Sequence, residues 1–420
     1  MITIGGQANT DAPSPVHILI YEPDYKGHRL TAVRVLLESL LEMESESGRR
    51  FDIVVTTGHE AIRSREFEIQ LEPISACFRL NAVEGVDYGA SPARIAAAKA
   101  RELLRILRAG TYDHLYVPYG DGLVQWLGML RLTGCLRWPA DLVAEAVLMR
   151  GTFAYTGRLR SRSVLALAAC RSAPFRHLHL IDPFAFARLP RWRGLRSKVD
   201  LMPDPTPAVA GTDRLTARRL LGLPEGGRYV GCAGQIDERK GIPALIEAFR
   251  RAALLPTDRL LLAGRCSDGV RKRLHAVGDG RIVVLDRYLT EAELHNAVSA
   301  IDLIVTPYPN FVGSVSICIR AAGAGRMCLG DESGWMGYVI PRFELGATCA
   351  VSDVGALARA IERHLPGAVG YVADGRARTF ASFFQPSNTN AHWTALLRRR
   401  LGLRPDPRKM SWPDPAPAPM

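Results

Sequence analysis

Short apolar runs alternate with longer segments of helical periodicity over most of the chain. Each run is too short for a helix and ends at glycine, proline or polar residues, which is typical of strands buried on both faces of a parallel sheet. In the first half of the chain the predicted strands are 16–21, 51–56, 73–80, 114–117, 143–149, 177–181 and 199–202. In the second half they are 229–233, 260–264, 282–285, 303–306, 327–329 and 347–350. Strands and helices that alternate in this way predict an α/β protein with doubly wound parallel sheets.

The alternation breaks at a proline-rich segment in the middle of the chain. Residues 199–207 carry three prolines within five residues, which can continue neither a helix nor a central strand. We therefore predict a linker here between two Rossmann-like domains. The predicted organisation is a disordered leader 1–15, a first domain 16–203, a second domain 204–370, a helical segment 371–402 and a proline-rich disordered tail 403–420.

The clearest βα unit opens the second domain, at residues 229–253. A charged turn follows its strand and delivers Lys240 and Gly241 to the N-terminal end of a helix. Unpaired N–H groups and the helix dipole make such an end a favourable place for a phosphate. The apolar residues of this helix share one face: Ile242, Leu245, Ile246 and Phe249. A solvated loop lysine is the alternative interpretation.

A second segment of the same architecture spans residues 307–326. A strand ends at Pro307, a Gly313-Ser314 turn follows, and an apolar helix comes next. The N–H groups near the turn would face a phosphate. Ser314 or Ser316 could equally cap the helix, so a serine here does not by itself separate binding from structure.

The first of these segments resembles a known motif. Residues 234–249 read GQIDERKGIPALIEAF and are similar to the GRLxxxKGxxxLIxAF segment of the GT-B retaining glycosyltransferases of family 4. In that family the Arg and the Lys contact the diphosphate of a nucleotide sugar. Lys240 matches the motif, whereas Gln235 stands in the place of the Arg and removes one charge-assisted contact.

The second segment resembles the PSxxEGFGxxxxEAxAxGxPV motif of the same family, whose two Glu residues bind the donor sugar and the ribose. Ala321 and Gly325 match this motif. Val312 and Arg320 occupy the two Glu positions, so both carboxylates are missing. Arg320 either replaces ribose recognition by a phosphate contact or marks a site that no longer performs catalysis.

The resemblance implies a GT-B fold, in which two Rossmann-like doubly wound domains face a cleft. The donor would bind the second domain, the acceptor the first, and the segment 371–402 would pack back on the first domain. His28, at the carboxyl end of the first strand, is the candidate catalytic contact. We expect no metal and no cofactor, because cationic side chains and a helix N-terminus could stabilise the departing diphosphate. The predicted donor-binding residues are Gly27, Gln235, Lys240, Gly313, Ser314 and Arg320.

The leading functional hypothesis is a glycosyltransferase that moves a sugar from a nucleotide-diphosphate donor to a glycan, lipid or small-molecule acceptor. The missing carboxylates leave open a catalytically inactive GT-B-shaped binding or scaffold protein. Another sugar-nucleotide enzyme of the same shape, such as an epimerase, is a further alternative, because a fold does not determine its chemistry.

Composition and charge indicate the cellular setting. The 420 residues are 47% apolar and 23% charged, with no apolar run long enough to cross a bilayer and no N-terminal signal pattern, so we expect a cytoplasmic protein. The formal charge of +12 favours partners that carry phosphate groups. A predicted helix at 391–401 ends in three arginines, which indicates either a peripheral contact with the inner face of the membrane or a solvated helix end. Nucleic acid is not an expected partner, because the basic residues form no strip interleaved with aromatic residues.

Overall fold

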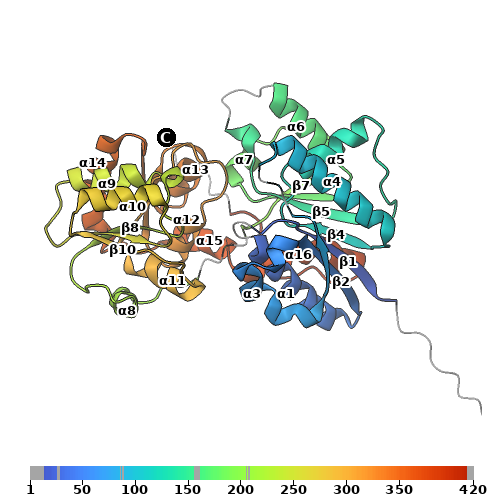
Figure 1. Ribbon diagram of the computed structural model, residues 1–420, viewed down its shortest axis with the longest axis horizontal. Coiled ribbons are helices and arrows are strands. Elements are labelled where there is room, and N and C mark those ends of the chain that lie inside the picture. Colours follow the sequence, from blue (N-terminus) through green and yellow to red (C-terminus); the bar gives the residue numbers. More distant parts are fainter. Residues whose placement is uncertain are drawn as a thin grey trace, which may run out of the picture.

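The computed structural model describes residues 14–25, 29–85, 87, 89–155, 161–204, 206 and 209–413. Two parallel sheets lie side by side, and each has helices on both faces (Figure 1). The strands before the proline-rich segment build one sheet, and the strands after it build the other. The predicted α/β class with two doubly wound sheets is confirmed.

The first sheet has seven parallel strands in the order β3-β2-β1-β4-β5-β6-β7. They are β1 (Val16–Tyr21), β2 (Phe51–Gly58), β3 (Arg79–Val83), β4 (His114–Val117), β5 (Val143–Leu148), β6 (His177–Leu180) and β7 (Val199–Leu201). The inner strands are mostly apolar because helices cover both faces of the sheet. Strand order reverses between β1 and β4, and the carboxyl ends beside such a reversal are the usual ligand position in open α/β sheets.

Helices α4, α5 and α6 cover one face of the first sheet, and α1, α3 and α16 cover the other (Figure 1). The helices of this half are α1 (Arg29–Ser47), α2 (His59–Ile62), α3 (Arg65–Gln70), α4 (Pro92–Ala109), α5 (Leu123–Leu132), α6 (Ser161–Ser172) and α7 (Pro183–Ala187), with the 3-10 turns η1 (Glu72–Cys77) and η2 (Thr152–Ala154). The last helix of the chain, α16, spans Pro386–Arg400.

The second sheet has six parallel strands in the order β10-β9-β8-β11-β12-β13. They are β8 (Tyr229–Ala233), β9 (Arg259–Ala263), β10 (Ile282–Leu285), β11 (Leu303–Thr306), β12 (Met327–Asp331) and β13 (Gly346–Cys349). Its helices are α8 (Arg214–Leu220), α9 (Ile242–Arg251), α10 (Asp268–Val277), α11 (Glu291–Ala300), α12 (Ser316–Gly323), α13 (Gly334–Arg342), α14 (Val354–Ala368) and α15 (Gly375–Phe383), with the 3-10 turn η3 (Glu238–Lys240). The predicted apolar face of α9 is confirmed, because all four of its residues are fully buried.

Residues 73–80 do not form the predicted strand. The turn η1 takes up Glu72–Cys77, and β3 begins only at Arg79. Pro73 lacks the N–H that a ladder needs. Strand β3 also lies at the edge of the sheet, where Arg79, Leu80 and Ala82 are exposed, so no apolar run marks it in the sequence.

The end of the chain returns to the first half of the molecule. Helix α15 packs against α12, whereas α16 packs against α1. Trp393 of α16 meets Tyr116 of β4 edge to face, with 6.1 Å between the ring centroids. Arg398 forms an ion pair with Glu46 of α1, with one pair of atoms at 2.6 Å. Helix α16 therefore belongs structurally to the first domain.

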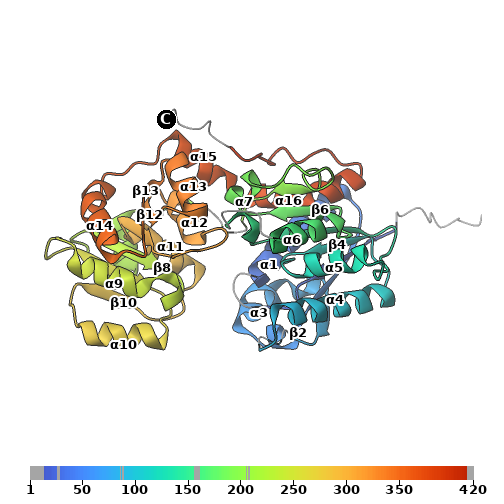
Figure 2. The same cartoon turned by 90° about the horizontal axis from the view of Figure 1, so that it is seen from above.

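The segment after α16 makes specific contacts with both domains. The part of the predicted disordered tail that is described, up to residue 413, runs across both domains (Figure 2). Arg408 pairs with Asp406 at 2.7 Å and with Glu42 of α1 at 2.8 Å. The Trp412 ring packs on Phe343 of the second domain, with centroids 5.2 Å apart. Ion pairs and aromatic packing hold a proline-rich segment that has no regular structure.

The carboxyl edges of the two sheets face each other. Tyr288, which follows β10, donates from its hydroxyl to Glu66 Oε2 in α3 at 3.3 Å. The Arg65 guanidinium lies 5.6 Å from the centre of the Tyr288 ring. Loops that leave the carboxyl ends of strands in both sheets thus meet each other.

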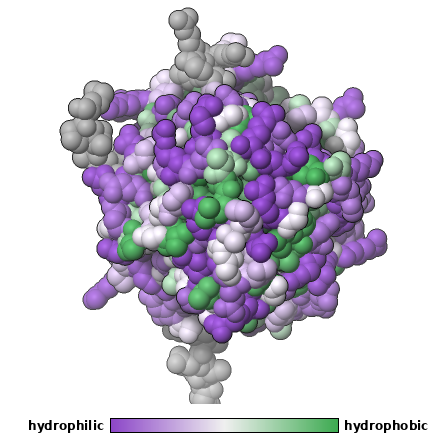
Figure 3. Space-filling view, turned by 90° about the vertical axis from the view of Figure 1, so that its left-hand side faces the viewer, coloured by the Kyte–Doolittle hydropathy of each residue, from purple (hydrophilic) through white to green (hydrophobic). Residues whose placement is uncertain are grey.

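The outer face of the second domain is mostly hydrophilic, and its apolar residues form narrow, broken strips (Figure 3). Exposed large apolar side chains of this half of the chain are scattered, and they include Leu215 and Leu220 of α8, Leu255, Val369 and Val372. In the part of the chain that the structure describes, no helix is both long and apolar enough to cross a bilayer.

Candidate functional site

The loop after β8 holds Lys240 by a local cap. The Asp237 side chain accepts a hydrogen bond from the Lys240 N–H at 3.0 Å and so closes the turn η3. Gly241 follows with φ of 69°, in the left-handed region that favours glycine. Helix α9 then starts at Ile242.

Gly241 also brings the two motif segments together. A Cβ at this position would overlap the carbonyl oxygen of Pro307, which follows β11. The loop that carries Lys240 is therefore packed directly against the segment that leads to Gly313 and α12. Only glycine permits both the backbone conformation and this close approach.

The Lys240 ammonium lies close to Gly234, and the Ile317 side chain of α12 approaches the same place. The Lys240 Nζ is 3.5 Å from the position that a Cβ of Gly234 would take, and Ile317 of α12 is 3.9 Å from the same point. The ammonium is also 5.4 Å from the centre of the Tyr308 ring. Burial lowers the pKa of Lys240, an effect that Cys232 and Asp237 oppose. In the described part of the chain no carboxylate forms an ion pair with Lys240.

The N-terminus of α12 is not capped by a side chain. The N-cap is Val315, so the predicted capping by Ser314 or Ser316 is wrong. The Ser314 hydroxyl oxygen is buried without a hydrogen-bond partner among the described residues. An ammonium, a helix N-terminus with free N–H groups and an unpaired hydroxyl can together bind a phosphate group.

Gly313 connects this region to the first domain. Its φ is 105°, and its N–H donates to the Tyr155 hydroxyl at 3.1 Å. The Tyr155 hydroxyl in turn donates to Asp182 Oδ2 at 2.6 Å. Burial raises the pKa of Asp182 to about 6, although the Tyr155 hydrogen bond opposes this shift. This contact could not be predicted from a local pattern, because it depends on how two distant loops approach each other.

Replacement of Tyr155 by Phe is expected to strengthen the binding of a phosphate-bearing ligand, such as a nucleotide, by roughly 2- to 10-fold. The substitution releases the Gly313 N–H for a phosphate oxygen, and a net hydrogen bond contributes about 0.5–1.5 kcal/mol. Calorimetric titration of wild type and variant with the same nucleotide measures the change. Tyr112→Phe is the control, since Tyr112 is half-buried before β4. Weaker binding by Tyr155→Phe would show that the hydroxyl itself contacts the ligand.

No described contact joins the other predicted donor-binding residues, Gln235 and Arg320, to Lys240. Gln235 is exposed at the end of β8. Arg320 is buried in α12, and its guanidinium pairs with Glu291 at the start of α11 at 2.8 Å. The positive charge of Arg320 is thus already paired, and among the described contacts none joins it to Lys240.

Gly27 and His28 lie outside the described residues. Beside them, at the carboxyl end of β1, Arg29 pairs with Glu22 at 2.9 Å and with Asp24 at 3.2 Å. The Arg29 guanidinium also lies 4.1 Å from the centre of the Tyr119 ring after β4. Burial raises the pKa of Glu22, and the positive charge of Arg29 opposes this rise. This cluster was not among the predicted site residues, although the position of Glu22 directly after a strand is a signal for it in the sequence.

The comparisons with known proteins rest on sequence and on structure. No family model matches the chain. The D-inositol 3-phosphate glycosyltransferase of Mycobacterium tuberculosis is 28% identical over 201 residues. This match spans 45% of the present chain and 41% of the relative, so the chain matches well under half of that protein's length.

Three solved structures share the architecture at low sequence identity. Sucrose-phosphate synthase from Thermosynechococcus elongatus superposes with a TM-score of 0.69 at 17% identity and covers 92% of this chain and 99% of its own. Anabaena HepE, determined in complex with UDP and glucose, gives 0.61 at 13% identity and covers 91% and 100%. A putative UDP-N-acetylglucosamine 2-epimerase from Listeria monocytogenes gives 0.60 at 14% identity and covers 94% and 98%.

These similarities cover both sheets and their order in the chain. Two parallel sheets flanked by helices, facing each other at their carboxyl edges, agree with the architecture that the two motif segments imply. The predicted resemblance is therefore confirmed, and the chain has the GT-B fold of the glycosyltransferases.

Proposed function

We propose that this protein is a glycosyltransferase whose second domain binds a nucleoside-diphosphate sugar. The observation that carries the proposal is the Lys240 ammonium, half-buried and without an ion-pair partner in the described chain. It lies near the Ile317 side chain of α12, a helix whose N-terminus has no side-chain cap. A buried cation without a carboxylate is costly unless an anion binds beside it. The complexes of HepE with UDP support a nucleotide as that anion.

In this proposal the positive charge acts on the leaving group. Negative charge develops on the diphosphate as the bond to the sugar breaks, and Lys240 with the N–H groups of α12 is positioned to stabilise it. The Gly313 N–H can also donate to the diphosphate once its hydrogen bond to the Tyr155 hydroxyl is broken. The proposal includes transfer without a metal ion, because Lys240 provides the positive charge.

The acceptor is proposed to bind the first domain, at the carboxyl ends of β1 and β4. Glu22 has one carboxylate oxygen, Oε2, that is buried without a hydrogen-bond partner among the described residues. Arg29 and Tyr119 lie beside it. A hydroxyl-bearing acceptor could donate to Glu22 Oε2, and His28 is the neighbouring candidate catalytic contact.

A specific observation favours a second candidate function, nucleotide-sugar binding without transfer. Val312 and Arg320 provide no carboxylate at the two motif positions, and Arg320 is neutralised by Glu291. Such a site could retain the diphosphate while failing to orient the sugar hydroxyls.

An activity assay separates the candidates. The full chain is incubated with UDP-, GDP- and ADP-sugars, with and without sugar and lipid acceptors, and the released nucleoside diphosphate is measured. Release from one donor class, reduced about 100-fold in Lys240→Ala, supports transfer. Binding without release supports the second candidate. A changed sugar that is still attached to its nucleotide would instead indicate an epimerase.

A further inference from the structure

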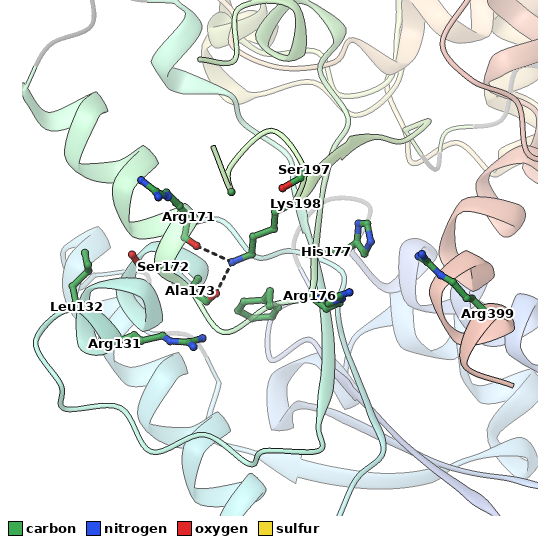
Figure 4. Close-up of a pocket in the computed structure, with 12 residues that line it drawn as sticks. Arg131, Leu132, Arg171, Ser172, Ala173, Arg176, His177, Ser197, Lys198 and Arg399 are labelled. Atoms are coloured by element: carbon green, nitrogen blue, oxygen red, sulfur yellow. Dashed lines mark hydrogen bonds between the residues drawn. The ribbon is translucent and has the colours of Figure 1, made fainter. Parts of the chain in front are cut away.

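A pocket of about 700 Å³ lies at the amino edge of the first sheet (Figure 4). The last turns of α5 and α6, the start of β6, the residues before β7 and one residue of α16 line it. His177 begins β6, whereas Asp182, which holds Tyr155, follows the carboxyl end of the same strand. The pocket and the donor region therefore lie at opposite ends of the strand.

The lining of this pocket is strongly cationic. Its basic side chains come from five positions: Arg131, Arg171, Arg176, Lys198 and Arg399. None of the lining residues is a carboxylate; Asp200 lies beside them, with its Oδ2 3.6 Å from His177 Nδ1. The ends of α5 and α6 contribute about half a negative charge each, roughly one in total against five positive charges. The negative charge of the two helix ends therefore neutralises only a small part of the positive charge of the pocket.

Lys198 has a structural role in the wall of the pocket. Its Nζ donates to the carbonyl oxygens of Arg171 and Ala173, at 3.2 and 2.5 Å (Figure 4). It also donates to the Cys170 carbonyl oxygen at 3.1 Å. It thereby satisfies the last carbonyls of α6. Burial lowers its pKa to about 8, and the charge of Arg131 acts in the same direction.

The four arginines have no such role. In the described part of the chain, the guanidiniums of Arg131, Arg171, Arg176 and Arg399 make no hydrogen bond or ion pair. The neighbours of Arg399 on α16 behave differently, because Arg398 pairs with Glu46 and Arg400 with Asp113. Arg399 alone of these three lines the pocket, and it approaches His177 from the side opposite Arg131 and Arg171 (Figure 4).

We propose that this pocket binds a phosphate-bearing anion at a site separate from the donor site. The planar guanidinium matches phosphate oxygens in pairs, which a lysine cannot do. The volume falls in the range of small-molecule sites. The ligand is a phosphorylated small molecule or the phosphate headgroup of an anionic lipid, and its binding would join α16 to the first sheet.

Calorimetry with inorganic pyrophosphate tests whether the pocket binds a soluble phosphorylated molecule. Every protein carries Lys240→Ala, so that the donor site does not contribute. The pocket variant combines Arg131→Gln, Arg171→Gln and Arg399→Gln. The control variant removes the same charge from exposed positions of the second domain, Arg273→Gln, Arg359→Gln and Arg363→Gln. The pocket variant is expected to bind at least about tenfold more weakly than the control, and thermal unfolding checks that both are folded.

Co-sedimentation of the same three proteins with lipid vesicles tests whether the pocket binds an anionic lipid headgroup. Vesicles of equal parts phosphatidylcholine and phosphatidylglycerol are compared with vesicles of phosphatidylcholine alone. Loss of pyrophosphate binding confined to the pocket variant supports a soluble ligand, and loss of anionic-vesicle binding confined to it supports a headgroup. Equal losses in the pocket and control variants, or no binding of either probe by the parent, would overturn the proposal.

Discussion

Replacement of Glu145 by alanine should lower the free energy of unfolding by about 3 kcal/mol or more. The Glu145 carboxylate is fully buried in β5 and accepts two hydrogen bonds, from His114 Nε2 at 2.8 Å and from His179 Nε2 at 2.9 Å. His179 also meets the Trp393 ring of α16, with centroids 6.1 Å apart. Loss of the carboxylate leaves both imidazoles without this partner and loosens the docking of α16.

The same group predicts how stability depends on pH. Burial alone would raise the pKa of Glu145, but the hydrogen bonds from His114 and His179 outweigh it and lower the pKa from 4.5 to about 2. A carboxyl whose pKa is lower in the folded state stabilises the fold above its ordinary pKa. This contribution, about 3 kcal/mol, is therefore complete above pH 4.5 and is lost as the pH falls towards 2.

Urea unfolding at several pH values measures both effects. The control is Glu68→Ala, an exposed glutamate of the same domain. A second variant, Glu145→Gln, removes only the charge. The difference in unfolding free energy between wild type and this variant should shrink as the pH falls from 4.5 towards 2. If Glu145→Ala is as stable as Glu68→Ala, the hydrogen-bonded carboxylate does not stabilise the first domain.

Gly241→Ala is the second substitution for which we expect a large effect. A left-handed backbone costs a residue with a Cβ about 1–2 kcal/mol, and here the Cβ would also overlap the Pro307 carbonyl. We expect a loss of more than about 2 kcal/mol in unfolding free energy, together with a loss of nucleotide binding, because the loop that carries Lys240 must move.

Gly278→Ala is the matched control for this substitution. Gly278 ends α10 with a similar φ of 58°, but no atom lies within 4 Å of the position a Cβ would take. The control carries the conformational cost without the overlap, so about 1 kcal/mol is expected and nucleotide binding should be unchanged. Equal destabilisation by the two substitutions would contradict the proposed contact between the two motif segments.

The strands that could be predicted are those whose residues form a short apolar run. Runs such as Tyr229–Ala233 consist of apolar residues between breakers, so position and type follow from the pattern. The edge strand Arg79–Val83 has no such run, because most of its side chains are exposed. The segment around Trp412 was predicted to be disordered from its prolines, and no local pattern predicts the contact of its ring with Phe343.

The candidate site could be predicted only in part, and for a physical reason. The position of Lys240 follows from a local strand, turn and helix. The partners of Arg320 and Tyr155 lie in other elements, Glu291 in α11 and Gly313 in the opposite domain. Contacts between residues distant in sequence depend on packing that no local pattern encodes.

Lys240 is proposed to bind the diphosphate of a nucleotide donor. Calorimetric titration of wild type, Lys240→Ala and Lys272→Ala with UDP, GDP and ADP tests it most directly, since Lys272 is an exposed lysine of the same domain. We predict that one nucleotide binds wild type and Lys272→Ala equally and binds Lys240→Ala about 30-fold more weakly or worse. Equal binding by all three proteins, or no binding by wild type, would contradict the account.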